Sequence, residues 1–292
     1  ALLFFLLKNS HEDIERIKKI PASILAIVVI LTLVEFYLNG IMLKVLLQPF
    51  NIHTRIKEWF GLSAITTFGN YLTFFRGGTT AKAVYLKKKH DLPYSHFLAS
   101  VGASYVITVF VYGLIGMLFS IIMLSYQHLF HLELFLLFVA LFIVSLIFIF
   151  FSPRFPETDK KILKHIYTIL NGWHTLRKNK LFVLKFSVLV FLLYAVSTSK
   201  LYLLYKALSY NIQPISAAFI TLLSNLSIFL SITPAGLGVR EAVVAVTSNI
   251  LDLGLKSGLY VSSLERAITI VLISIIGPIF SYILIKKTTQ TS

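Results

Sequence analysis

Residues 92–151 read LPYSHFLASVGASYVITVFVYGLIGMLFSIIMLSYQHLFHLELFLLFVALFIVSLIFIFF, with a single acidic residue, Glu133, and no Lys or Arg. A helix of this length would extend to about 90 Å, far beyond the roughly 30 Å of a bilayer's hydrocarbon core. The stretch must therefore fold back on itself. The polar cluster QHLFH at 127–131 is the candidate turn. We predict two membrane helices, at 94–125 and 131–151.

The composition of the whole chain also indicates a membrane protein. Of its 292 residues, 57% are hydrophobic and only 13% are charged, whereas an ordinary soluble domain is about 25% charged. A soluble globule could not bury so much apolar surface, because folded proteins keep a polar exterior. We therefore exclude a soluble enzyme, a nucleic-acid-binding protein and a disordered chain. The predicted fold is all-α, a polytopic integral membrane helix bundle.

Other apolar stretches bring the expected total to about seven to eight membrane segments. Further full spans are predicted at 21–47, 181–207 and 255–285. Residues 1–7 are apolar but too short to span, and we interpret them as the tail of a helix that begins upstream rather than as a signal peptide. The whole chain, 1–292, is predicted to be one transmembrane domain.

Two apolar segments, 59–75 and 214–232, are short and lead into Gly-rich sequence instead of a charged loop. They also share a weak repeat, in which an Ile-Thr pair and an Asn precede glycines and a cation. The first copy is Ile65-Thr66, Asn70, Gly77-Gly78 and Lys82, and the second copy is Ile220-Thr221, Asn225, Gly236, Gly238 and Arg240. Paired interrupted segments point to a transporter site built from broken helices. We predict re-entrant or broken helices near 59–82 and 214–251, with the two sets of glycines beside a shared cavity.

The formal net charge is +15, and the basic residues gather in the connections at 82–91, 152–180 and 286–287. The positive-inside rule and the anionic inner leaflet place such connections in the cytoplasm, which predicts a multi-pass protein of the cell membrane. Within 152–180, apolar residues recur at helical spacing. This pattern predicts a cytoplasmic amphipathic helix on the membrane surface between two halves of the protein.

The stretch ITPAGLGVREA at 232–242 carries the most chemical information. Pro234 blocks a continuous helix, and Gly236 and Gly238 allow backbone angles that other residues avoid. A broken helix is tolerated in a membrane only where it is buried in protein or lines a watery cavity. Arg240 and Glu241 follow at the expected start of a new helix, where backbone donors freed by the break and a guanidinium would suit a phosphate.

Other ionisable residues also fall inside predicted spans. Glu35 lies in the middle of a span, where a lone carboxylate is costly, so we expect it to be neutral or paired with Lys44 or Lys200. The chain has no Cys, and its eight His residues show no metal-ligand spacing. We therefore predict no metal and no cofactor.

Two motifs resemble those of a known family. Pro234-Ala-Gly-Leu-Gly-Val-Arg-Glu241 is similar to the Pro-Gly-Gly-(Leu/Val)-Gly-x-x-Glu signature of the lysylphosphatidylglycerol synthase transmembrane-region family. These flippase-like domains occur alone or fused to an aminoacyl-transferase domain, as in the multiple peptide resistance factor. The stretch from Asn70 through Arg76-Gly77-Gly78 to Lys82 resembles a second family segment, and Glu265-Arg266 resembles the Arg-bearing start of the family's last helix. The resemblance extends over 20–287.

The chain departs from the family within the first motif. Thr79 stands where the family has an acid, and Lys82 replaces an Arg. Further on, Ser104-Tyr105 stands where an acid–Arg pair is frequent. We therefore do not transfer ion coupling through this motif from the family to this chain. The positive charge of the motif is retained in Arg76 and Lys82.

The resemblance implies a flippase or transporter that handles an anionic or aminoacylated phospholipid, or a polyprenyl-linked lipid. The headgroup-binding set it implies is Arg76, Gly77, Gly78, Lys82, Pro234, Gly236, Gly238, Arg240 and Glu241. Supporting charge pairs would come from Glu35, Lys200, Glu265 and Arg266.

Two alternatives stay open at this point. The chain could be a non-catalytic membrane subunit that hands lipid to a separate synthase or glycosyltransferase partner. It could also be an intramembrane lipid-modifying transferase, for which only Glu241 and Glu35 qualify as a base. Because the longest polar stretch is 152–180, we expect no soluble aminoacyl-transferase domain in this chain, and we favour a protein without enzyme activity over the intramembrane transferase. Assembly into a homo-oligomer is a further option.

Overall fold

The computed structural model describes residues 20–73, 76–124, 131–151, 173, 176, 179–230 and 233–289. Three predictions fall outside this part of the chain. They are the apolar tail at 1–7, the turn at 127–131 apart from His131, and the amphipathic helix within 152–180 apart from Trp173, Leu176 and the last two residues of that range. All three remain predictions.

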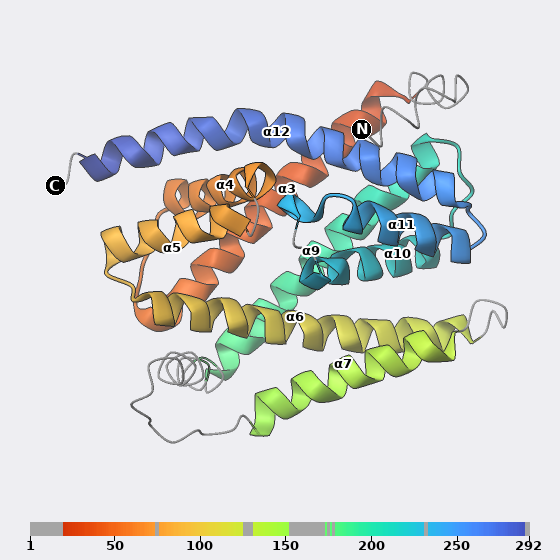
Figure 1. Ribbon diagram of the computed structural model, residues 1–292, viewed down its shortest axis with the longest axis horizontal. Coiled ribbons are helices and arrows are strands. Elements are labelled where there is room, and N and C mark those ends of the chain that lie inside the picture. Colours follow the sequence, from red (N-terminus) through yellow and green to blue (C-terminus); the bar gives the residue numbers. More distant parts are fainter. Residues whose placement is uncertain are drawn as a thin grey trace. The chain divides into compact units, whose positions relative to one another are not determined.

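The described residues form helices and no strand, which confirms the all-α fold (Figure 1). The α-helices are α3 (Ala22–Leu47), α4 (Ile56–Leu72), α5 (Gly77–His90), α6 (Tyr94–Met123), α7 (Leu132–Phe151), α9 (Lys180–Ala207), α10 (Pro214–Leu226), α11 (Val239–Ile250) and α12 (Leu255–Thr289). Short 3₁₀ turns are η1 (Gln48–Phe50), η4 (Ser227–Leu230) and η5 (Pro234–Gly236).

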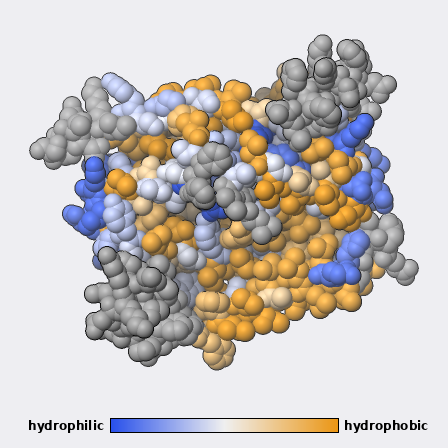
Figure 2. All heavy atoms as spheres, in the orientation of Figure 1, coloured by the Kyte–Doolittle hydropathy of each residue, from blue (hydrophilic) through white to orange (hydrophobic). Residues whose placement is uncertain are grey.

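Five of these helices are long and apolar enough to cross a membrane: α3, α6, α7, α9 and α12. The fold-back predicted for 92–151 is confirmed, since α6 ends at Met123 and α7 begins at Leu132. Hydrophobic residues cover much of the face shown in Figure 2, and on α7 only Phe138 and Ser145 are buried. A helix with so much exposed apolar surface needs lipid as its solvent.

The two short segments are interrupted, as the sequence predicts. Helix α4 ends at Leu72 and α5 begins at Gly77. Helix α10 ends at Leu226, and two 3₁₀ turns precede α11. Neither segment runs as one helix through its glycines.

The chain divides into two compact units, each assembled from segments far apart in the sequence. The first unit comprises Tyr194–Ser274 together with the described residues up to Glu35, and the second comprises Phe36–Leu193 with the chain from Ile275 onward. Each unit contains one of the interrupted segments, α10–α11 in the first and α4–α5 in the second.

In the second unit, the helices pack as antiparallel pairs with small residues at the contacts. Gly113 of α6 faces Phe142 of α7, and Gly116 faces Phe138, so the two helices run antiparallel. Helices α4 and α5 also lie side by side. A Cβ atom on Gly78 would come within 2.0 Å of the Thr66 carbonyl oxygen, so only glycine permits this approach.

In the first unit, α10 and α11 pack against each other, and α12 packs against α11. A Cβ atom on Gly258 of α12 would lie 2.6 Å from the Cα atom of Ala245 on α11. Tyr194 of α9 donates a hydrogen bond of 2.8 Å to the carbonyl oxygen of Ala218 on α10. Within the break before α11, Gly236 is buried, whereas Leu237 and Gly238 are exposed.

Candidate functional site

The site is built around the start of α11. Gly238 precedes this helix with a φ of +88°, a value that L residues with a side chain rarely adopt. Its N–H donates a 2.7 Å hydrogen bond to Oε2 of Glu241, so Glu241 caps its own helix. The acid next to Arg240 thus has a clear structural role at the helix N-terminus.

Other backbone donors of the break are also occupied. The N–H of Gly236 bonds to the carbonyl oxygen of Thr233 at 3.1 Å, and that of Leu237 bonds to Pro234 at 3.0 Å. The expectation that the break frees backbone donors for a phosphate is therefore wrong for residues 236–238.

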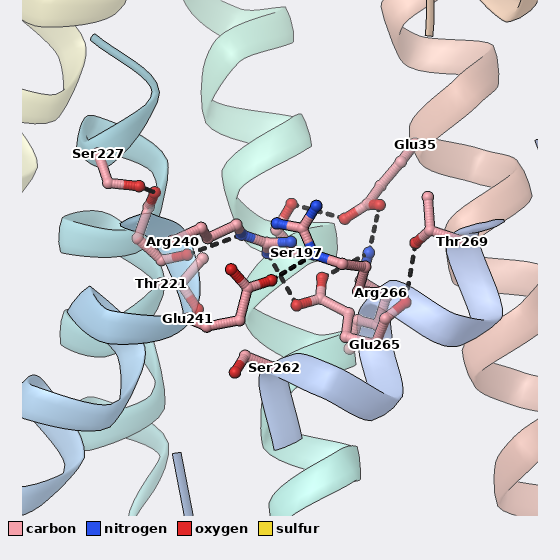
Figure 3. Close-up of polar contacts among 12 residues, drawn as sticks. Glu35, Ser197, Thr221, Ser227, Arg240, Glu241, Ser262, Glu265, Arg266 and Thr269 are labelled. Carbon is pink, nitrogen blue, oxygen red and sulfur yellow. Dashed lines mark hydrogen bonds and ion pairs between the residues drawn. The ribbon is translucent and has the colours of Figure 1, made fainter. Parts of the chain in front are cut away.

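Arg240 extends from the first turn of α11 toward α10 and α12. Its Nε donates to the hydroxyl oxygen of Ser224 at 2.9 Å, and its Nη2 lies 2.8 Å from Oε2 of Glu265. Ser224 and Glu265 thereby fix the plane of the guanidinium. Figure 3 shows Arg240 and Glu265 in the cluster.

Lys200 of α9 lies between two carboxylates. It pairs with Oε2 of Glu35 on α3, and its Nζ is 2.9 Å from Oε1 of Glu265 on α12. The Ser197 hydroxyl donates a second hydrogen bond of 2.6 Å to Glu35. Of the two partners proposed for Glu35, the structure has Lys200 in contact.

Arg266 completes the cluster from α12. Its Nε pairs with Oε1 of Glu241, and its Nη2 donates to the Ala235 carbonyl oxygen at 3.3 Å. One side chain therefore holds both the cap of α11 and the backbone of the break.

These six charged residues form what we call the ionic network: Glu35, Glu241 and Glu265 against Lys200, Arg240 and Arg266. Their formal charges cancel, which is what burial demands, because an unbalanced charge in a low-dielectric interior costs several kcal/mol, about 3–5 when one partner is removed. The cations differ in accessibility. The Arg240 side chain is 24% exposed, against 8% for Arg266 and 3% for Lys200.

The residues of the first motif lie in the second unit, where the cations contact aromatic rings. The guanidinium of Arg76 hydrogen bonds to the Tyr105 hydroxyl and lies 5.6 Å from its ring centre. Nζ of Lys82 lies 5.9 Å from the Phe97 ring centre, and burial lowers the pKa of Lys82 to about 8. The predicted cavity shared by the two sets of glycines remains a prediction.

Gly77 and Gly78 have a packing role in the structure. A Cβ atom on Gly77 would lie 2.4 Å from the Thr73 hydroxyl oxygen, and Gly78 contacts the backbone of α4. The Asn70 side chain accepts a 3.2 Å hydrogen bond from the Thr79 N–H, which ties the start of α5 to α4. The close approach of two helices thus accounts for both glycines without a ligand.

Sequence reasoning missed the neutral partners of the charged residues. Ser224 contacts Arg240, and Tyr105 contacts Arg76. Ser197 contacts the carboxylate of Glu35. Hydroxyl residues are frequent in membrane helices, so their type carries little signal. Two of them had an indirect signal, because Ser224 precedes Asn225 of the weak repeat and Tyr105 stands where the family frequently has an acid–Arg pair.

The fold and the ionic network define a polytopic helical membrane protein with a balanced charge cluster beside an interrupted helix. The sequence model of the lysylphosphatidylglycerol synthase TM region matches residues 1–277, and the chain belongs to this family. It is also similar to the UPF0104 membrane protein MJ1595 of Methanocaldococcus jannaschii, with 24% identity over 314 aligned residues that cover 98% of this chain and 93% of that protein. No solved structure matches the chain.

Proposed function

We propose that this protein binds the phosphate of an anionic or aminoacylated lipid headgroup at Arg240 and moves the lipid between the leaflets of the cell membrane. A polyprenyl-linked lipid phosphate has the same chemistry. The observation that carries the proposal is the position of Arg240, the most exposed cation of the ionic network, beside an interrupted helix.

Arg240 has the chemistry for a phosphate. A guanidinium offers several donors in one plane, matches two phosphate oxygens at once and stays charged where water is scarce. In the structure it already binds a planar anion, the carboxylate of Glu265. An arriving phosphate would take the place of that carboxylate, and Ser224 would keep the side chain oriented.

Two further observations favour transport over group transfer. The carboxylates considered as a catalytic base are engaged, since Glu241 binds Arg266 and caps α11, while Glu35 binds Lys200. An acid held by a cation is a poor proton acceptor. The interrupted helices are typical of membrane transporters, in which broken helices line the substrate path.

The test is lipid movement in liposomes that contain the purified protein. A fluorescent phosphatidylglycerol is placed in both leaflets, and an impermeant quencher reports how fast the inner pool reaches the outside. Arg240→Gln should slow this movement by about tenfold or more, since a hydrogen bond to a charged group contributes about 1.5–3 kcal/mol. Arg240→Lys should give an intermediate rate, because it keeps the charge and loses the planar donor pair.

The matched control is Arg55→Gln, which neutralises an exposed arginine before α4. It should move lipid at the parent rate. Each variant is checked for reconstituted amount and for thermal unfolding in detergent. If a well-folded Arg240→Gln protein moves lipid as fast as the parent, Arg240 is structural and the proposed function fails at this site.

A further inference from the structure

The charge balance of the ionic network links anion binding to protons. Glu35 and Glu265 share the ammonium of Lys200, and Arg240 holds the other oxygen of Glu265. Two carboxylates are thus matched by two cations. The second ion pair, Glu241 with Arg266, is balanced by itself.

An anion at Arg240 would upset this balance. If the guanidinium turns from Glu265 to a phosphate, its charge compensates the phosphate instead. Glu35 and Glu265 then keep one ammonium between them, that of Lys200. Two carboxylates around one cation in a buried site hold an excess negative charge, and such pairs take a proton because both cannot stay ionised.

We propose that the Glu35–Glu265 carboxylate pair takes up one proton from water when a lipid phosphate binds Arg240, so that anionic-lipid binding is coupled to proton binding. This inference rests on the proposed function. The proton forms an O–H bond on a carboxylate oxygen of the pair. It returns to water when the phosphate leaves and Arg240 pairs with Glu265 again. No other reactant is needed.

The proton belongs to the pair rather than to one residue, because interacting acids titrate together. Glu35 faces Lys200 and the Ser197 hydroxyl, and Glu265 faces Lys200 and Arg240. The hydroxyl of Tyr205, also on α9, contributes a weaker electrostatic interaction with Glu265. Glu35 is the more accessible of the two carboxylates, since its side chain is 14% exposed and that of Glu265 only 2%, and the proposal takes it as the site at which the proton enters.

The sign of the coupling follows from linkage. When binding takes up one proton, lipid affinity falls as pH rises. The fall is about tenfold per pH unit over the range in which the carboxylate pair is unprotonated in the free protein and protonated in the lipid complex. A transporter with this coupling would carry a proton with each anionic lipid. A proton gradient could then drive the lipid in one direction.

The first experiment counts protons. Short-chain phosphatidylglycerol is titrated into the purified full chain in detergent, in two buffers whose ionisation enthalpies differ. The difference in binding heat between the buffers gives the protons exchanged, and about one proton should be taken up per lipid bound. Infrared difference spectra should show a protonated carboxyl band that appears with the lipid.

Glu35→Gln separates the coupling from the binding. With Gln at this position, Lys200 and Glu265 stay balanced after Arg240 leaves, so lipid should bind without proton uptake and with an affinity that no longer depends on pH. The control is Glu133→Gln, which neutralises an exposed carboxylate at the start of α7 and should still take up the proton. If Glu35→Gln does not fold, the presence or absence of the protonated carboxyl band in the parent protein decides whether lipid binding is coupled to proton uptake.

The outcomes distinguish the two proposals. Lipid binding without proton uptake or carboxyl band in the parent protein would overturn the coupling and leave the proposed function standing. Proton uptake that persists in Glu35→Gln would overturn the assignment to this pair. A parent protein that does not bind phosphatidylglycerol or a polyprenyl phosphate overturns both proposals.

Discussion

Replacing Glu241 with Gln tests whether the ionic network stabilises the fold. The carboxylate has two roles, as the cap of α11 through Oε2 and as the partner of Arg266 through Oε1. A glutamine has one oxygen and one amino group at these positions. If its oxygen keeps the bond to the Gly238 N–H, its amino group faces the guanidinium, and two donors then oppose each other.

The magnitude follows from these two contacts. Removing one partner of a buried ion pair costs about 3–5 kcal/mol, and losing a helix cap costs about 0.5–2 kcal/mol. Since the amide can preserve only one contact, we expect Glu241→Gln to lower the free energy of unfolding by at least 3 kcal/mol, about the lower bound for a broken buried pair.

The assay is equilibrium unfolding of the purified protein in mixed micelles, followed by far-ultraviolet circular dichroism. Arg266→Gln and the double variant complete a cycle, in which the two changes together should cost clearly less than their sum. Glu133→Gln serves as the exposed control. If Glu241→Gln costs no more than this control, or if the cycle is additive, Glu241 and Arg266 are not coupled and the structural reasoning fails.

Three shorter predictions concern the second unit. Gly78→Ala should destabilise the protein by about 1–3 kcal/mol, because the new Cβ atom would lie 2.0 Å from the Thr66 carbonyl oxygen. Gly102→Ala is the control and should be tolerated in the same unfolding assay, because nothing lies within 4 Å of its new Cβ atom. Lys82, with its pKa lowered to about 8, should reach its full acylation rate at a lower pH than exposed lysines do, and a rate that rises over the same pH range as theirs in peptide mass mapping would contradict the burial argument. A cysteine at Asn171 should react with an impermeant reagent only from the inner side, and labelling of intact cells from outside would reverse the predicted topology.

Much of the fold could be predicted because lipid imposes strong rules on sequence. The absence of Lys and Arg from 92–151 is enough to require a helical hairpin, and α6 and α7 end close to the predicted residues. The interruption at Pro234–Gly238 was also predictable, since proline and glycine act on the local backbone. Both features could be predicted because they depend on local sequence alone.

The contacts of the candidate site are different, because they join distant segments. Local sequence indicates that Glu35 needs a partner, but cannot choose between Lys44 on its own helix and Lys200 on α9. The bridge from Lys200 to Glu265 depends on how three helices pack. The packing role of Gly78 could not be predicted for the same reason, since its close approach to the backbone of α4 depends on how the two helices pack.

The pairing of Glu35 with Lys200 also bears on how the protein is made. The two residues are separated by 165 positions, so α3 enters the membrane long before its counter-charge is synthesised. A lone acid at the centre of a span raises the free energy of insertion by about 2.5–3.5 kcal/mol. The α6–α7 hairpin, by contrast, can assemble as soon as it emerges from the ribosome. We therefore expect the first unit to mature late in biosynthesis and to be the part of the nascent chain most dependent on insertion factors.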